Sequence, residues 1–96
     1  MGEKIFYIND KEQSEFTAPY VHIYGVRSLE GQLDIAVYSD SSIIELTVNG
    51  VAACRQKSDH GAFDFLVSDP KGIAVIRAQS VDSPEVFDEV DVDTLR

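Results

Sequence analysis

Acidic residues gather near the C-terminal end of the sequence, where their carboxylates could bind a calcium ion. The cluster consists of Asp82, Glu85, Asp88, Glu89, Asp91 and Asp93. Calcium needs several oxygen ligands that converge on one point. Alternate residues of a strand point to opposite faces, and the spacing lacks the glycine turn of a calcium loop. We therefore expect no metal site, and interpret the run as a charged face that protects an edge strand from aggregation.

Ser58, Asp59 and His60 are the residue types of a hydrolase triad, in consecutive positions. Catalytic triads are assembled from distant parts of a chain, because sequence neighbours do not readily form a nucleophile, a base and an orienting group in line. We interpret the three residues as a turn and expect no catalytic residue. Cys54 is the only cysteine, so an intramolecular disulfide and a site of several thiolates are excluded. We expect it to be an inert strand residue.

Tyr20, His22 and Tyr24 alternate with Val21 and Ile23, which is the pattern of a strand with three ring side chains on one face. The two tyrosines would lie about 13 Å apart along that strand. Sugar-binding sandwiches stack pyranose rings on exposed aromatic rings, although this chain has no tryptophan. Tyr20, His22 and Tyr24 are therefore the candidate contacts to a glycan or to a neighbouring domain, with His22 expected to be a packed or interface histidine.

The size and charge of the chain restrict the classes of function that it can have. Its 96 residues predict one domain, and 44% hydrophobic residues are enough for one modest core. The net charge of −9 repels phosphate groups, which disfavours binding to nucleic acid or to an anionic membrane. No apolar run approaches the roughly 20 residues that span a bilayer. We expect no cofactor and favour a cytoplasmic location, although a longer parent protein could be exported.

The elements that must position these residues are organised around residues 33–50. Leu33, Ile35 and Val37 alternate with polar or smaller residues and predict one strand, and residues 44–48 predict a second after a polar turn. Asn49-Gly50 then supplies the positive φ angles of a two-residue hairpin loop. The segment therefore predicts a nucleus of three antiparallel strands, the third beginning at Val51.

The register of the third strand depends on the length of this loop. With two loop residues, Val51 pairs with Val48 and Ala53 pairs with Leu46, so that both point to the core. Cys54 then lies on the opposite face. A longer loop would bring Cys54 to the core face and turn Ala53 away from it.

The remaining sequence predicts more short strands separated by turns. A strand over residues 20–24 ends at Gly25, and residues 27–32 form a turn-rich connection. Later strands are expected over residues 63–67, 73–80 and 86–95. Residues 1–15 are interpreted as a flexible N-terminal segment or linker, and residues 16–96 as an all-β immunoglobulin-like β-sandwich of six to seven antiparallel strands, with a small barrel as the structural alternative.

Three local patterns resemble the C-terminal immunoglobulin-like domain of glycoside hydrolase family 2 proteins, the β-galactosidase and β-glucuronidase group. They are Pro19-Tyr20-Val21-His22-Ile23, then Val37-Tyr38-Ser39 followed closely by Ile44-Glu45-Leu46-Thr47-Val48-Asn49-Gly50, and finally Ile76-Arg77-Ala78. The chain departs from the family pattern at Asp40, where asparagine is common, and at residues 51–54, where a lysine-containing return is common. Residues 4–8 are similar to the end of the last helix of the catalytic barrel.

The resemblance implies a non-catalytic accessory domain that packs on the catalytic barrel of a glycosidase. The paired carboxylates of a retaining glycosidase, about 5 Å apart, belong to that barrel. No residue of this chain matches a barrel motif, so no catalytic residue is carried over. The expected partner is the barrel of the parent protein, which acts in carbohydrate metabolism, and carbohydrate is a second candidate partner.

Two other functions fit the same pattern. A free-standing carbohydrate-binding module would bind sugar through Tyr20 or Tyr24. An adhesin or surface-protein module would occur in tandem copies behind an export signal.

Overall fold

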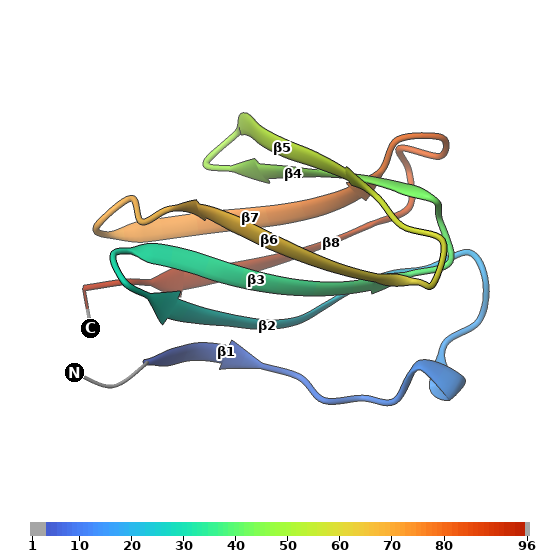
Figure 1. The fold of residues 1–96 in the computed structure, drawn as a ribbon, viewed down its shortest axis with the longest axis horizontal. Coiled ribbons are helices and arrows are strands. Elements are labelled where there is room, and N and C mark those ends of the chain that lie inside the picture. Colours follow the sequence, from blue (N-terminus) through green and yellow to red (C-terminus); the bar gives the residue numbers. More distant parts are fainter. Residues whose placement is uncertain (1–3, 96) are drawn as a thin grey trace.

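The strands form two four-stranded antiparallel sheets that pack face to face (Figure 1). We describe this architecture from a computed structural model, which describes residues 4–95. In chain order the elements are β1 (Ile5–Ile8), the short 3₁₀ helix η1 (Gln13–Glu15), β2 (Val21–Leu29), β3 (Gln32–Ser39), β4 (Ile43–Val48), β5 (Val51–Lys57), β6 (Ala62–Ser68), β7 (Ile73–Ser80) and β8 (Phe87–Asp93). Within residues 4–95 no helix is long and apolar enough to cross a membrane.

The strand order confirms the all-β immunoglobulin-like sandwich. One sheet has the order β1-β2-β3-β6 and the other the order β5-β4-β7-β8. Three hairpins, β2–β3, β4–β5 and β7–β8, each stay within one sheet, while the connections after β3, β5 and β6 cross to the opposite sheet. Strands β2 to β8 supply the seven expected strands, and β1 is an additional strand at the edge of the first sheet.

The core lies between the two sheets and follows the alternation of the sequence. Inward-facing residues of both sheets are buried, and their neighbours point to solvent. The largest fully buried side chains are Phe65, Ile23, Leu33, Ile35, Ile44, Leu46 and Ile76. These residues come from five strands, so the sandwich is held by contacts between segments far apart in the sequence.

Strand β1 forms within the segment that the sequence analysis treats as a linker. Ile5 pairs with Arg27 and Ile8 pairs with Gly25, which adds β1 to the free edge of β2. The helical conformation implied by the similarity of residues 4–8 to the end of a barrel helix is therefore wrong, because residues 5–8 form a strand. The edge of β2 offers unpaired backbone groups, and a short run of apolar residues satisfies them as a strand.

The hairpin of β4 and β5 confirms one half of the predicted register and corrects the other. Asn49 and Gly50 form the two-residue loop with φ angles of 53° and 82°, and Val48 pairs with Val51. A bulge then follows, so that Leu46 pairs with Cys54 rather than with Ala53. The extra residue of a β-bulge reverses the facing of the residues after it. Cys54 therefore packs against the core.

Ala53 and Val51 are exposed instead of buried, and Val51 retains 69% of its accessible surface. The reason is the position of β5 at the edge of its sheet. Here the opposite sheet does not cover the strand fully, so an inward-facing position near the hairpin loop stays in contact with solvent. The prediction that both residues face the core is wrong for Ala53, which is the extra residue of the bulge, while Val51 pairs with Val48 as predicted but is not buried.

Gly25 lies inside β2 and does not end it, contrary to the sequence analysis. The strand continues to Leu29, which pairs with Gln32 across a two-residue turn of Glu30 and Gly31. The pairing of β2 with β3 shifts register between Ile23 and Gly25, which places a bulge there. Glycine in a strand often marks such a bulge or the close approach of another backbone. A Cβ atom at Gly25 would lie 3.5 Å from the carbonyl oxygen of Tyr7 in β1.

Asn49 fastens the hairpin to the neighbouring strand β7. Its side-chain amide donates to the carbonyl of Ile73 at 3.1 Å, and its side-chain oxygen accepts from the N–H of Val75 at 2.8 Å. The Asn49 side chain therefore takes the place of a strand residue where β4 has ended. The Asn49 N–H also donates to the carbonyl of Val75 at 2.8 Å.

Replacing Asn49 with glycine is expected to lower the free energy of unfolding by about 1.5 kcal/mol. Glycine keeps the positive φ angle at no steric cost, so the loss isolates the two side-chain hydrogen bonds from the turn itself. Urea denaturation monitored by tyrosine fluorescence measures the change. An unchanged unfolding midpoint in N49G would show that the turn alone fixes this hairpin.

Candidate functional site

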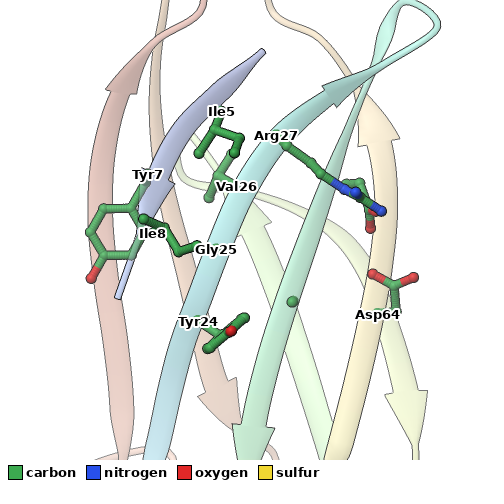
Figure 2. Close-up of a pocket in the computed structure, with 10 residues that line it drawn as sticks. Ile5, Tyr7, Ile8, Tyr24, Gly25, Val26, Arg27 and Asp64 are labelled. Carbon is green, nitrogen blue, oxygen red and sulfur yellow. The ribbon is translucent and has the colours of Figure 1, made fainter. Parts of the chain in front are cut away.

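A groove of about 300 Å³ lies along the outer face of the first sheet. Its apolar part is formed by residues of β1 and β2, and its polar part by charged side chains of three neighbouring strands. Figure 2 shows Ile5 and Ile8 pointing from β1 toward β2, while Arg27 reaches from β2 across β3 toward Asp64 on β6. The remaining lining residues are Tyr7, Tyr24, Gly25, Val26, Asp34 and Ala36.

Strand register brings Arg27 and Asp34 together. They face each other across the β2–β3 hairpin, and Asp34 is buried although it lies on the outer face. The Nε and Nη2 atoms of Arg27 lie 2.9 Å and 2.8 Å from the same carboxylate oxygen, Oδ2 of Asp34. A charge-assisted pair of this kind holds the Asp34 carboxylate in one position.

Asp64 lies diagonally across from Asp34, because Asp64 pairs with Ala36 on the neighbouring strand. The carboxyl groups of Asp34 and Asp64 are close enough to share a hydrogen bond. This hydrogen bond, followed by partial burial and the charge of Asp34, raises the pKa of Asp64 to about 6. Burial alone would raise the pKa of Asp34, but the hydrogen bonds from Asp64 and Arg27 and the charge of Arg27 outweigh it and lower that pKa.

The carboxyl pair differs from the catalytic pair of a glycosidase. Retaining glycosidases hold two carboxyl groups about 5 Å apart on either side of the scissile bond. Carboxyl groups that share one proton are in direct contact, so a sugar ring cannot lie between them. What the pair can do is accept hydrogen bonds from a cation or a hydroxyl group that lies in the adjoining apolar groove.

We expect the carboxyl pair to make folding stability depend on pH in a defined direction. The pKa of Asp64 is about 6 in the folded chain, against 3.8 for an unperturbed aspartate. Protonation of Asp64 therefore stabilises the fold fully below about pH 4, and this stabilisation is lost as the pH rises through about 6. The pKa of Asp34 is lowered, so Asp34 changes folding stability only below about pH 4 and does not affect the range between pH 4 and pH 6.

The variant Asp64→Asn removes this dependence because the amide keeps a hydrogen bond to Asp34 without titrating. Between about pH 4.5 and pH 7.5, the unfolding free energy of the native chain should fall by about 1 kcal/mol relative to D64N, a figure discounted for solvent screening. Urea denaturation of both proteins at the two pH values measures the difference. The variant D91N, which removes an exposed carboxylate elsewhere, should follow the native chain, and equal behaviour of D64N and D91N would contradict the shared proton.

The three candidate contact residues do not form one open face. Tyr20 lies just before β2, and its ring stacks on Phe16 with centroids 4.9 Å apart. His22 is 5% exposed, and Phe16 also covers its ring at 4.6 Å. Tyr24 lies at the bulge, where its ring contacts Tyr38 at 5.3 Å. Only Tyr24 among the three lines the groove.

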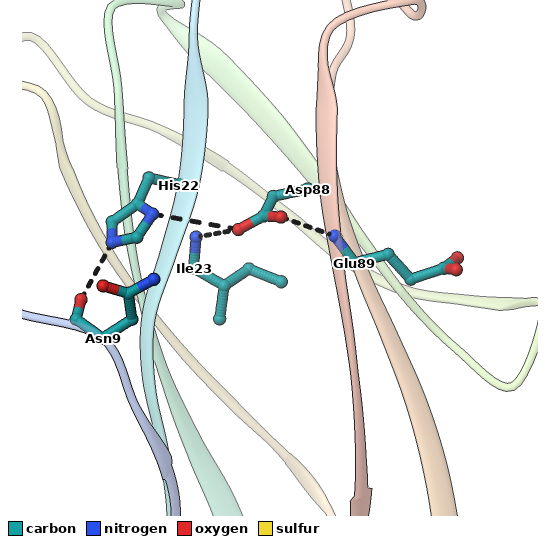
Figure 3. Close-up of polar contacts among 5 residues, drawn as sticks. All are labelled: Asn9, His22, Ile23, Asp88 and Glu89. Carbon is teal, nitrogen blue, oxygen red and sulfur yellow. Dashed lines mark hydrogen bonds and ion pairs between the residues drawn. The ribbon is translucent and has the colours of Figure 1, made fainter. Parts of the chain in front are cut away.

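His22 belongs to a set of polar contacts that joins the two sheets at one edge. Its Nε2 atom donates to the carbonyl of Asn9 at 2.9 Å, and its Nδ1 atom lies 3.9 Å from Oδ2 of Asp88 on β8 (Figure 3). The same oxygen of Asp88 accepts the N–H of Ile23 at 2.9 Å. Strand β1 ends before this part of β2, so Asp88 satisfies a buried N–H that no strand reaches.

The Ser58–His60 segment and the C-terminal acidic residues form local contacts of the backbone. The N–H of His60 donates to Ser58 Oγ at 3.3 Å within the turn, and no hydrogen bond links their side chains to Asp59 within residues 4–95. Asp93 accepts the N–H of Leu95 at 3.0 Å. In the part of the chain that the structure describes, no three His, Cys, Asp or Glu side chains gather where they could hold a metal ion.

Sequence reasoning missed the groove, although one signal for it was present. Glu30-Gly31 is a turn dipeptide, and a two-residue loop there places Arg27 directly opposite Asp34. No local pattern indicated that Asp64 lies beside Asp34. This proximity depends on the pairing of β3 with β6, and between these two strands the chain forms β4 and β5 of the other sheet.

Comparison with protein-family models and with curated proteins finds no match to this chain, so the assignment of function rests on the sequence resemblance and on the geometry above.

Proposed function

We propose that the chain is a non-catalytic accessory β-sandwich domain of a family 2 glycosidase and packs on the catalytic barrel through the outer face of its first sheet. The observation that supports this choice of face is the groove beside β1. Ile5 and Ile8 retain 61% and 59% of their accessible surface there. Exposed apolar side chains around a groove are typical of a surface that another protein covers.

The polar groups of the domain support a non-catalytic function. Arg27 forms an ion pair with Asp34, and Asp88 accepts a hydrogen bond from the N–H of Ile23. The Ser58–His60 segment forms a turn in which the N–H of His60 donates to Ser58 Oγ. Each of these groups stabilises the sandwich. None of these arrangements combines a nucleophile with a base in the geometry that hydrolysis needs.

The isolated chain is expected to hydrolyse neither a chromogenic β-galactoside nor a β-glucuronide above the rate of a blank. A matched control is the variant D64N, which alters the carboxyl pair while keeping the sandwich. Turnover by the native chain that D64N abolishes would refute the non-catalytic assignment.

Docking through the first sheet is tested by amide hydrogen exchange in the whole encoded protein and in the isolated chain. We expect slower exchange in β1 and in the adjoining half of β2 in the whole protein, since a covered edge opens less often. Exchange in the β4–β5 hairpin should be equal in both samples. Equal exchange of β1 in both samples would contradict docking through this face.

Carbohydrate binding is the second candidate, and Tyr24 favours it because this ring lies in the groove beside two carboxyl groups. Carboxylates accept hydrogen bonds from sugar hydroxyls, and a ring can stack on the sugar. Saturable binding on a glycan array that Tyr24→Ala abolishes would support this function. Tyr20→Ala is the comparison variant, because Tyr20 stacks on Phe16 away from the groove.

A further inference from the structure

We infer that Asn49 is a site of covalent modification by deamidation, and that the folded sandwich slows this reaction by holding the Asn49 side chain on β7. An asparagine that precedes glycine loses its side-chain amide when the next backbone nitrogen attacks it, and Asn49-Gly50 is such a pair. The site lies in the β4–β5 hairpin of the second sheet and does not depend on the proposed function. Deamidation of Asn49 therefore records how often this hairpin opens.

The reaction needs only the chain itself and water. The Gly50 nitrogen gives its proton to solvent and attacks Cγ of Asn49. The new bond between this nitrogen and Cγ closes a succinimide ring, while the bond between Cγ and Nδ2 breaks, and Nδ2 takes a proton from solvent and leaves as ammonia. Water then opens the ring at either of its carbonyl groups, which gives aspartate or isoaspartate.

The attacking side of the pair is open to solvent. Asn49 and Gly50 are both exposed, and Gly50 has no side chain that could shield its nitrogen. A Cβ atom placed on Gly50 would meet no atom of residues 4–95 within 4 Å, apart from its neighbours in the chain. Solvent can therefore take the proton of Gly50 and supply the water, so any protection must come from the position of the Asn49 side chain.

Two hydrogen bonds hold the planar amide of Asn49 against β7. Nδ2 donates to the carbonyl of Ile73 at 3.1 Å, and Oδ1 accepts the N–H of Val75 at 2.8 Å. Attack converts the planar Cγ into a tetrahedral centre and then removes Nδ2, so the amide cannot react while it keeps both hydrogen bonds. The N–H of Asn49 also donates to the carbonyl of Val75 at 2.8 Å, which fixes the backbone beside β7. The reaction therefore requires the hairpin to open away from β7 first.

The products weaken the contact that slows their formation. Aspartate at position 49 keeps an oxygen for the N–H of Val75 but has no donor for the carbonyl of Ile73, and it brings a negative charge beside that carbonyl. Isoaspartate also adds a methylene group to the backbone of a loop that consists of Asn49 and Gly50 alone. A modified chain therefore closes its hairpin less firmly, and refolding does not reverse the change.

The first test compares the native chain with the same chain unfolded in guanidinium chloride, at one mildly alkaline pH and one temperature. Mass spectrometry of the proteolytic peptide that contains Asn49 measures the fraction in which an acid has replaced the amide. We expect deamidation to be about 10- to 30-fold slower in the native chain, the factor that two ordinary hydrogen bonds supply. Equal rates in the two samples would overturn the inference.

The variant Val75→Pro separates the hydrogen bonds to β7 from the geometry of the turn. Val75 directs both its N–H and its carbonyl to Asn49, so proline removes the donor to Oδ1 without removing a hydrogen bond between β7 and β8. The matched control is Val75→Ala, which keeps the N–H. V75P should deamidate about fivefold faster than V75A. Equal rates in V75P and V75A would show that the turn alone protects Asn49 and would contradict the role of β7.

Amide hydrogen exchange in the native chain is a second measurement, which decides the matter even where V75P fails to fold. The N–H of Val75 exchanges when its hydrogen bond to Asn49 opens, so its protection factor measures the same opening. We expect this protection factor and the slowing of deamidation to agree within about tenfold. A larger difference in either direction would mean that deamidation does not follow the opening of the hairpin from β7, and the inference would be wrong.

Discussion

Replacing Asp88 with alanine is expected to lower the free energy of unfolding by about 2 kcal/mol. The carboxylate of Asp88 accepts the N–H of Ile23, a residue with no exposed surface, at 2.9 Å. Alanine leaves this buried N–H without a partner, which costs more than the hydrogen bond itself contributes. It also removes the contact of Asp88 on β8 with the ring of His22, whose Nδ1 atom lies 3.9 Å from Oδ2 of Asp88, and so loosens the contact between the two sheets at this edge (Figure 3).

Two further variants separate this effect from a general loss of negative charge. Asp88→Asn keeps a side-chain oxygen that can accept from Ile23, so it should lose less than about 1 kcal/mol. Asp91→Ala removes an exposed carboxylate from the same strand and should change stability by less than about 0.5 kcal/mol. Urea denaturation measures all three. Equal loss in D88A and D91A would contradict the role of Asp88 as the acceptor for Ile23.

Replacing Phe65 with alanine is expected to lower the free energy of unfolding by about 4 kcal/mol, the largest effect of any substitution proposed for this chain. Phe65 has no exposed surface, pairs with Ile35 and lies beside Phe63, with ring centroids 6.4 Å apart. Removing its ring leaves a cavity between two sheets that are both held by their own hydrogen bonds and cannot close fully.

The neighbouring residue Leu66 is the matched control for Phe65. Leu66 is 49% exposed on the outer face, so Leu66→Ala should lower stability by less than about 1 kcal/mol. Thermal unfolding followed by circular dichroism compares the two variants. A larger loss in L66A than in F65A would mean that β6 is displaced by one residue, since such a shift exchanges the two faces of a strand.

Hydrophobic alternation predicted most strands because it is a local signal. The strand predicted over residues 73–80 forms β7 with the same bounds, and the strand predicted over residues 63–67 forms the middle of β6. Asn49-Gly50 predicted a two-residue loop because few other dipeptides adopt two positive φ angles. These features depend on residues close together in the chain, so sequence reasoning can reach them.

The features that sequence reasoning missed depend on contacts between strands. The bulge that brings Cys54 to the core has no local pattern, and Gly25 looked like the end of a strand when it is a bulge within one. Strand β1 exists because β2 has an edge to pair with. The carboxyl pair of Asp34 and Asp64 needs the register of β3 against β6. Such pairings follow from the assembled sandwich and not from any one segment.

Sequencing the reading frame that encodes this chain, on both sides of it, tests the proposed function most directly. The proposal predicts that the frame also encodes a glycosidase barrel with two catalytic carboxylates, to which this sandwich is attached. A frame that instead encodes tandem sandwich copies behind an export signal, or this sandwich without a barrel, would contradict it.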